Sequence, residues 1–184
     1  MLQLKELGFI DLMNAISKDE KMTLALPKGR ILEEVLPLLE KAGIKPEDSF
    51  VDSNSRKLKY STNEKYLDLI SVRSFDVATF VAFGAAQLGI AGDDVVQEFD
   101  YSEVYAPLNL NIGHCRLCLA APMKLLKNED PSSWSNIRVA TKYPNLTKRF
   151  FADRGVQVDP IKLNKLNFQK CLGTFFQHWA DQNN

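Results

Sequence analysis

The segment formed by residues 22–34 most constrains how this chain can fold. Thr23–Leu26 has apolar bias, a Pro-Lys-Gly-Arg turn follows, and apolar residues then recur at helical spacing over 31–42. This order predicts a strand, a tight turn and a helix. Free N–H groups at the helix start, together with two side-chain cations, favour an anion in the turn. A solvated turn without a ligand is the alternative. The candidate binding residues of the turn are Lys28, Gly29 and Arg30.

Composition excludes several classes of function. The 184 residues, 45% hydrophobic and 25% charged, suit one sizeable domain or two small lobes. Because 23 Lys and Arg balance 23 Asp and Glu, net charge favours neither nucleic acid nor an anionic membrane as a partner. No apolar run approaches the ~18 residues of a membrane span. Residues 1–21 lack the pattern of a secretory signal and predict a short amphipathic helix or a frayed extension.

Cysteine usage predicts a reduced, cytoplasmic protein, because the three cysteines are an odd number. Cys115 and Cys118 form a C-x-x-C pair, but no second pair accompanies them and the histidines are limited to His114 and His178. A zinc site would need further ligands, so no metal site is predicted. Two buried structural thiols facing opposite sides of a strand are the preferred interpretation.

Strands and helices are predicted to alternate along the chain. The predicted strands are 23–26, 66–72, 88–91, 114–121, 137–141 and 156–163, and the predicted helices are 31–42, 77–84, 95–99 and 145–154. Asp76 is the expected cap of the second helix. A second lobe is predicted from residue 114 onward. This order indicates an α/β fold with helices on the faces of a sheet and ligands at the carboxyl ends of the strands.

Further candidate residues follow predicted strand ends or precede helices. They are Arg73, Gly92, Asp93, Asp94, Arg116 and Thr141. Each has a plainer alternative: a surface ion pair for Arg73, and an N-cap of helix 95–99 for Asp94. Arg116 is placed at the crossing between lobes, and Thr141 before a helix start that can hold phosphate. Neither histidine has a plausible catalytic setting, and no catalytic residue is predicted.

Six stretches of the chain, taken together, resemble the short-form catalytic subunit of ATP phosphoribosyltransferase, the first enzyme of histidine biosynthesis. They occur in that family's order and spacing across residues 22–164. The stretches are Leu24-Ala-Leu-Pro-Lys-Gly-Arg30, Asp68-Leu-Ile-Ser-Val-Arg73, Gly84-Ala-Ala-Gln-Leu-Gly-Ile-Ala-Gly-Asp-Asp94, Gly113-His-Cys-Arg-Leu-Cys-Leu-Ala-Ala-Pro122, Val139-Ala-Thr-Lys-Tyr-Pro-Asn145 and Ile161-Lys-Leu-Asn164.

The resemblance implies a two-lobed fold of the periplasmic-binding-protein type II class with the site in the cleft. It implies Mg²⁺-dependent attack of the adenine N1 of ATP on C1 of phosphoribosyl pyrophosphate (PRPP), with pyrophosphate leaving. Such chemistry depends on positioning two polyanions and neutralising charge. The resemblance also implies an oligomer and a regulatory subunit similar to a histidyl-tRNA synthetase.

The resemblance ends after Asn164. The family continues to an acidic Thr-Gly-x-Thr loop that holds the PRPP 5-phosphate, whereas this chain has an unrelated tail over 165–184 whose nearest match is Gly173-Thr174. The expected organisation is an extension (1–21), a first lobe (22–113), an incomplete second lobe (114–164) and this tail, with the C-terminal elements of the fold missing. A frame change or a native tail would each explain the switch. Apolar tail residues predict a helical face: Phe168, Leu172, Phe175, Phe176 and Trp179.

Three functions remain open from the sequence. One is the ATP phosphoribosyltransferase catalytic chain, with its activity in doubt because the PRPP loop is absent. Another is a non-catalytic nucleotide-binding or assembly module of the same fold, which the missing loop favours. An extracytoplasmic solute receptor shares the architecture, but the expected absence of a signal segment and the Lys-Gly-Arg turn disfavour it.

Overall fold

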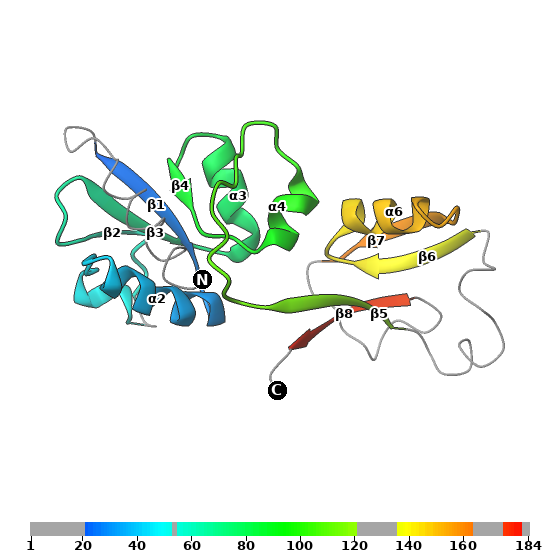
Figure 1. Ribbon diagram of the computed structural model, residues 1–184, viewed down its shortest axis with the longest axis horizontal. Helices are drawn as coiled ribbons and strands as arrows, with labels where there is room; N and C mark the ends of the chain where they lie inside the picture. Colours follow the sequence, from blue (N-terminus) through cyan, green and yellow to red (C-terminus); the bar gives the residue numbers. More distant parts are fainter. Residues whose placement is uncertain (1–20, 53–54, 121–135, 164–174, 182–184) are drawn as a thin grey trace. The chain divides into compact units, whose positions relative to one another are not determined.

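The computed structural model describes residues 21–52, 55–120, 136–163 and 175–181 (Figure 1). The chain divides into two compact units, Met1–Gly113 and His114–Asn184, called unit 1 and unit 2 below. Two predicted features lie outside the described residues. They are the N-terminal helix within 1–20 and the tail segment 165–174.

Unit 1 is built on a four-stranded sheet with the order β2-β3-β1-β4. Its strands are β1 (Met22–Pro27), β2 (Lys59–Ser61), β3 (Leu67–Val72) and β4 (Leu88–Gly89). Its helices are α2 (Arg30–Lys41), α3 (Ser74–Ala82) and α4 (Asp93–Phe99), with a 3₁₀ turn over Asp48–Phe50. β1 pairs in parallel with β3 and β4, whereas β2 pairs antiparallel with β3. Each of the three helices therefore begins shortly after the carboxyl end of a parallel strand.

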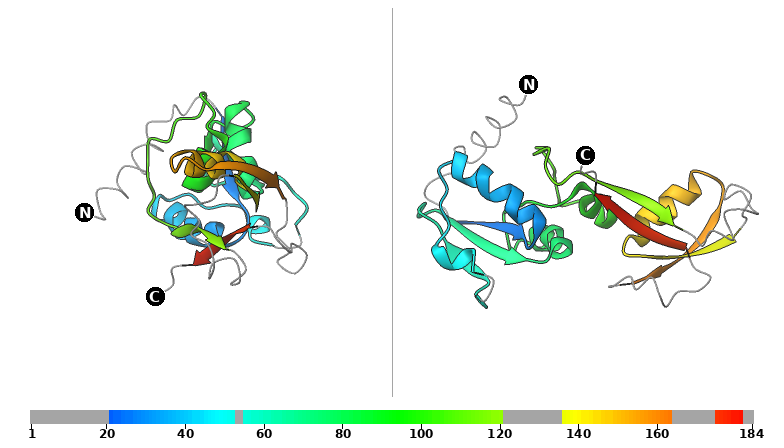
Figure 2. Two further views of the ribbon diagram at one scale, coloured as in Figure 1. Left: turned by 90° about the vertical axis from the view of Figure 1, so that its right-hand side faces the viewer. Right: turned by 90° about the horizontal axis from the view of Figure 1, so that it is seen from below.

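The helices α2 and α3 pack on opposite faces of this sheet (Figure 2). Side chains alternate between the two faces along β1. The buried cluster on the α2 side contains Leu24, Leu26, Val35 and Leu39. Ala25, which lies between the two leucines, packs instead with Val77 of α3. Because both faces of β1 are covered, its four residues from Leu24 to Pro27 are buried, as the apolar run predicts.

β4 approaches α3 closely because Gly89 has no side chain. A Cβ at Gly89 would lie 2.7 Å from Val77 Cγ1 and 2.8 Å from Val81 Cγ2. Both neighbours are β-branched and stiff, so a larger residue would push α3 away from the sheet. Gly89 thereby fixes the position of the helix that begins after β3.

The last segment of unit 1 is attached to α2. The Gly113 N–H donates a hydrogen bond to Glu34 Oε2 of α2 over 2.8 Å. Gly113 has a φ of +62°, in the left-handed region that favours glycine. The apolar residues of this segment that pack against the α2-side cluster are Leu108, Leu110 and Ile112.

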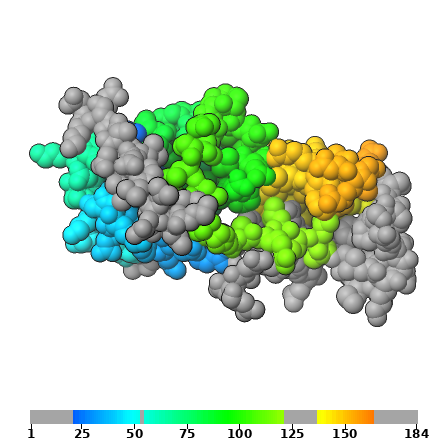
Figure 3. All heavy atoms as spheres, viewed as in Figure 1, coloured from blue at the N-terminus to red at the C-terminus, as the bar shows by residue number. Residues whose placement is uncertain are grey.

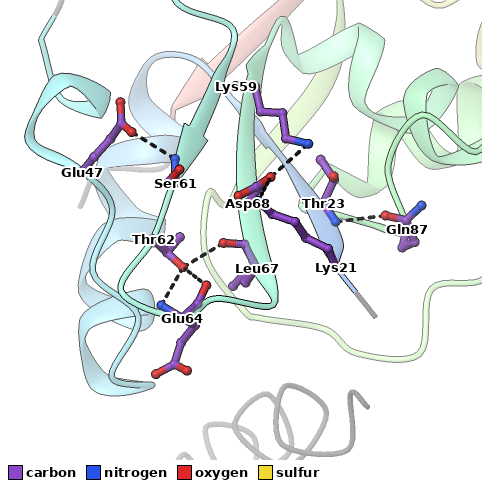
Figure 4. Close-up of polar contacts among 10 residues, drawn as sticks. All are labelled: Lys21, Thr23, Glu47, Lys59, Ser61, Thr62, Glu64, Leu67, Asp68 and Gln87. Atoms are coloured by element: carbon purple, nitrogen blue, oxygen red, sulfur yellow. Dashed lines mark hydrogen bonds and ion pairs between the residues drawn. The ribbon is translucent and has the colours of Figure 1, made fainter. Parts of the chain in front are cut away.

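A carboxylate organises the loop that precedes β2. Glu47 accepts a hydrogen bond from the Ser61 N–H at 3.1 Å (Figure 4). It also accepts from Lys57 Nζ at 2.5 Å and from the Ser49 hydroxyl. These hydrogen bonds lower the pKa of Glu47 from 4.5 to about 2. The bond from Lys57 contributes most, followed by the bonds from Ser49 and Ser61. This network ties the loop to the edge of the sheet.

The Glu47 network is expected to make unit 1 acid-sensitive. The pKa of Glu47 is about 2 in the folded state and 4.5 ordinarily, so its carboxylate takes up a proton in the unfolded state first as the pH falls. The contribution of Glu47 to the free energy of unfolding is therefore complete above pH 4.5 and is lost as the pH falls toward 2. Between these limits, the urea midpoint of the wild type should fall more steeply with pH than that of Glu47→Gln. Glu40→Gln, at an exposed position of α2, is the matched control. Equal slopes for all three proteins would contradict this role.

Unit 2 contains a second four-stranded sheet with the order β5-β8-β6-β7. Its strands are β5 (Cys115–Ala120), β6 (Asn136–Thr141), β7 (Gln157–Lys162) and β8 (Phe175–Asp181). β6 pairs in parallel with β7 and β8, and β5 pairs antiparallel with β8. The helix α6 (Pro144–Ala152) follows β6 and packs on β6 and β7. The buried core of this unit contains Ile137, Val139, Phe151 and Val156.

Two predictions for unit 2 are wrong. The tail was expected to form a helical face, but residues 175–181 form the strand β8, whose backbone pairs with β5 and β6. An aromatic-rich run suits a strand as well as a helix, and here sheet pairing decides. Cys115 and Cys118 do not form a pair of buried thiols, since Cys115 is exposed and Cys118 is half-buried. Two mixed sheets with helices packed on them confirm the predicted α/β class.

Candidate functional site

The candidate residues of unit 1 meet at the carboxyl edge of its parallel strands. Pro27, the last residue of β1, is in register with Val72, the last residue of β3. The Lys28 N–H donates to the Val72 carbonyl over 2.9 Å, so the turns that follow β1 and β3 lie side by side. β4 pairs with the other side of β1, and the Ile90 N–H continues this pairing to the Ala25 carbonyl over 3.0 Å. Three strand–helix connections therefore leave the same edge.

The β1–α2 connection has the geometry of an anion-binding turn. Gly29 is the N-cap of α2 with a φ of +88°, and no side chain caps the helix. The Gly29 carbonyl accepts from the Leu32 N–H over 2.9 Å. A Cβ at Gly29 would meet nothing within 4 Å, so the backbone at the helix start is open on this side. Lys28 and Arg30 flank it and are exposed. Helix dipole and side-chain charge both favour an anion here.

The β3–α3 connection adds a third cation. Arg73 is the N-cap of α3, with extended backbone and an exposed side chain. Its carbonyl accepts a hydrogen bond from the Asp76 N–H over 2.8 Å. Asp76 was predicted to cap this helix, but it is the third helical residue. The prediction is wrong because the apolar pattern begins later than the helix, which starts directly after β3 at Ser74.

The β4–α4 connection brings carboxylates to the same edge. Gly92 is the N-cap of α4, so the alternative that Asp94 caps this helix is also wrong. Asp93 accepts a hydrogen bond from the Gln97 amide one turn later. A Cβ at Gly92 would collide with Asp94 Oδ1, so the Asp94 carboxylate folds back over Gly92 and would have to move if a side chain were added there.

The remaining two candidates belong to unit 2. Arg116 is exposed on β5 and is in register with Ala180 of β8. Thr141, the last residue of β6, is fully buried, and its hydroxyl accepts from the Tyr143 N–H over 2.9 Å. Thr147 Oγ1 lies 3.4 Å from the same hydroxyl. Thr141 thus joins the end of β6 to the start of α6. The residues that the structure brings together at one edge are Lys28, Gly29, Arg30, Arg73, Gly92, Asp93 and Asp94.

The sequence-based site prediction omitted the buried carboxylate Asp68. It lies near the amino end of β3, away from the candidate edge, and forms ion pairs with Lys21 at 3.0 Å and Lys59 at 2.9 Å (Figure 4). Burial raises the pKa of Asp68, but the two lysines outweigh burial and leave it below its ordinary value. The signal in the sequence was a charged residue inside an otherwise apolar strand, which requires a partner. The geometry assigns Asp68 a structural role.

In the described part of the chain, no three His, Cys, Asp or Glu side chains come together in a way that would hold a metal ion. None of the described helices combines the length and apolar character needed to cross a bilayer. The edge formed by Lys28, Arg30, Arg73 and the two carboxylates is therefore the strongest candidate site in the described residues.

Comparison with known proteins identifies the family. The family model for ATP phosphoribosyltransferase (HisG) matches residues 73–164. ATP phosphoribosyltransferase from Paramagnetospirillum magneticum is 59% identical over 149 residues, covering 81% of this chain and 68% of that protein. The protein of the same name from Rhodospirillum rubrum is 59% identical over 145 residues, covering 79% of this chain and 64% of that protein. The chain thus spans about two thirds of the length of these relatives.

A solved structure gives the same result. The ATP phosphoribosyl transferase (HisG:HisZ) complex from Thermotoga maritima superposes with a TM-score of 0.67 at 28% sequence identity. The match covers 88% of this chain and 75% of the solved chain. Sequence relatives, family model and structural neighbour agree with the resemblance found in the motifs, and the chain belongs to the ATP phosphoribosyltransferase family.

Proposed function

We propose that this chain binds ATP and PRPP and serves in transfer of the phosphoribosyl group to the adenine N1 of ATP, as the first step of histidine biosynthesis. In that reaction N1 forms a bond to C1 of the ribose while the bond from C1 to pyrophosphate breaks. The observation that carries the proposal is the convergence of Lys28, Arg30 and Arg73 at two uncapped helix starts in a member of this family.

The proposed role of this edge is to bind phosphate and offset its charge. The leaving pyrophosphate gains negative charge as its bond to C1 breaks, and fixed cations and helix N–H groups stabilise such charge without reorganising. No protein nucleophile is required, because the attacking atom belongs to ATP. Holding the two substrates in line accounts for much of the expected acceleration. Lys28 and Arg30 are proposed to bind phosphate at the start of α2, and Arg73 is proposed to bind phosphate at the start of α3.

Mg²⁺ is proposed to enter with the substrates. Mg²⁺ in nucleotide sites typically binds to substrate phosphates and one or two carboxylates, keeping several waters. The carboxylates of Asp93 and Asp94 at the candidate edge fit that donor set, whereas a cage made by the protein alone would need more ligands. When bound, the ion would neutralise phosphate charge and help pyrophosphate to leave.

The wider setting is proposed from the family. Arg116 of unit 2, exposed on β5, is proposed to contact the same substrates in a fold of the periplasmic-binding-protein type II class, whereas the buried Thr141 is proposed to hold the start of α6 in place. The solved neighbour is a complex with HisZ, which supports a regulatory partner and an oligomer for this chain. The cytoplasm, which supplies ATP and keeps thiols such as Cys115 and Cys118 reduced, is the proposed compartment.

Release of pyrophosphate from ATP and PRPP tests the proposed reaction. Purified chain with Mg²⁺, with and without a HisZ-type partner, is expected to produce phosphoribosyl-ATP and pyrophosphate in equal amounts. Arg73→Ala should lower the rate at saturating ATP, while Lys65→Ala, a cation outside the candidate edge, should not. ATP binding without any pyrophosphate release would contradict the enzymatic proposal and assign the chain a nucleotide-binding role.

A further inference from the structure

The last described strand of the chain occupies an inner position in the sheet of unit 2. β8 (Phe175–Asp181) lies between β5 and β6 in the order β5-β8-β6-β7, and it is seen beside β5 in Figures 1 and 2. β5 pairs antiparallel with β8 along its whole length, Cys115 to Ala120. On its other side, β8 pairs in parallel with β6 at Val139 and Ala140. β5 and β6 are therefore joined through a segment that follows both of them in the sequence.

This order requires the sheet to receive β8 after its neighbours exist. β5, β6 and β7 all precede β8 in the sequence, so synthesis of the chain produces them first. Until β8 pairs, the backbone N–H and C=O groups of β5 and β6 that face it lack this strand partner. Unpaired strand edges of this kind accept an extended segment by strand addition. The two backbone edges that face β8, along Cys115–Ala120 and at Val139 and Ala140, are called the acceptor edges.

β5 depends on backbone pairing more than on a buried core. All six residues of β5 are described and none of them is buried, and Figure 3 shows this strand at the surface. Among the described residues, the buried cluster of unit 2 contains Ile137, Val139, Phe151 and Val156, and it takes no residue from β5. An isolated pair of strands is at best marginally stable in water. We therefore expect β5 to keep its strand conformation only while β8 joins it to β6.

We propose that the acceptor edges form a docking site for one extended segment, that its occupant is residues 175–181 of the same chain, and that this segment docks last and reversibly. The register carries the choice of occupant, because β8 is antiparallel to β5 and parallel to β6 at the same time. Reversible docking follows from the length of the pairings. β6 pairs with β7 from Asn136 to Thr141, but with β8 at Val139 and Ala140. β5 and β8 should therefore leave the sheet before β6 and β7 separate.

Docking of the tail also fixes the backbone of a candidate site residue. Arg116 is in register with Ala180 of β8, so the docked segment determines whether Arg116 is held in the sheet. This consequence rests on the proposed function, in which Arg116 contacts the substrates. The docking itself rests on the strand pairing alone and is tested without substrates.

Amide hydrogen exchange in the full chain tests the docking. Gln177→Pro with His178→Pro removes two consecutive N–H groups of β8, one of which faces β5, since such groups alternate between the two sides of a strand. The amides of β5 should then exchange at least roughly 100-fold faster than in the wild type. Gln177→Ala with His178→Ala keeps both N–H groups and is the matched control, with β5 exchange expected within about threefold of the wild type. Unchanged exchange in β1 and β3 establishes that unit 1 of each variant is folded.

A synthetic peptide of residues 173–184 distinguishes docking from general damage to unit 2. Added in excess to the proline variant, this peptide should return β5 exchange to within about threefold of the wild type, because it supplies the missing strand. The same peptide with both prolines should have no effect. β5 amides that stay protected in the proline variant would overturn the proposal, and so would failure of the wild-type peptide to restore their protection.

Two further readouts identify the occupant and separate this proposal from the proposed function. Protection of β5 that increases with protein concentration in the wild type would assign the docked strand to a second copy and overturn the choice of the same chain. Pyrophosphate release should fall in the proline variant and return with the peptide. Tail-dependent exchange in β5 without pyrophosphate release from the wild type would support the docking and contradict the proposed function alone.

Discussion

Replacing Lys28 and Arg30 together by alanine is expected to weaken ATP binding by roughly two orders of magnitude. Each side chain is proposed to make a charge-assisted contact to phosphate worth about 1.5 kcal/mol, so both together correspond to roughly 100-fold in the dissociation constant. Their exposed positions beside the α2 start make a folding defect from this change unexpected. Isothermal titration of ATP into wild type and variant measures the difference, and raising the salt concentration should reduce it.

The matched control for this double variant uses the opposite end of the same helix. Lys41→Ala with Lys45→Ala removes two positive charges at the end of α2 and just beyond it. A helix of 12 residues is about 18 Å long, so these charges lie outside direct contact distance of a phosphate at the helix start. The control should bind ATP within about twofold of the wild type, because exposed charges at that distance are largely screened. Equal losses of ATP affinity in both double variants would show that the effect comes from net charge and not from contacts at the helix start.

Leu26→Ala is expected to destabilise unit 1 by about 3 kcal/mol, because a buried leucine leaves both lost burial and a cavity. Leu26 is fully buried in β1, one residue before Pro27, and packs in the cluster that holds α2 on the sheet. Amide hydrogen exchange in β1 and β3 should become roughly 100-fold faster if these amides exchange by unfolding of the unit.

Leu58→Ala is the control for Leu26→Ala, since its side chain is 66% exposed and little burial is lost. Its effect on exchange should correspond to less than about 0.5 kcal/mol. Comparable exchange rates in the two variants would show that the β1–α2 contact does not support unit 1. ATP affinity of Leu26→Ala, measured where the variant is still folded, should fall less than that of the Lys28 and Arg30 double variant.

The strand–turn–helix unit at residues 22–41 could be predicted because its signals are local. Four apolar residues, the Pro-Lys-Gly-Arg turn and an apolar stripe each limit the backbone within a few residues. The glycine at position 29 is required by its φ of +88°, which few other residues adopt. Local sequence signals also placed Arg73 and Gly92 correctly at the connections between a strand and the following helix.

Features that depend on distant pairing could not be predicted. The order β2-β3-β1-β4, which brings the turns after β1 and β3 together, results from contacts between segments far apart in sequence. β8 was missed for the same reason, because its strand state depends on β5 and β6. The buried ion pairs of Asp68 could not be predicted, because its partners Lys21 and Lys59 are not adjacent to it in the sequence.

Amide chemical shifts during an ATP titration test the central claim most directly. If ATP phosphates bind at the carboxyl edge of the unit 1 strands, the largest changes should appear at the amides of Gly29, Arg30 and Ser74, at the starts of α2 and α3. The amide of Asp68, near the other end of β3, should change little. Saturable changes confined to residues away from Gly29, Arg30 and Ser74, or no changes at all with excess ATP, would contradict the account.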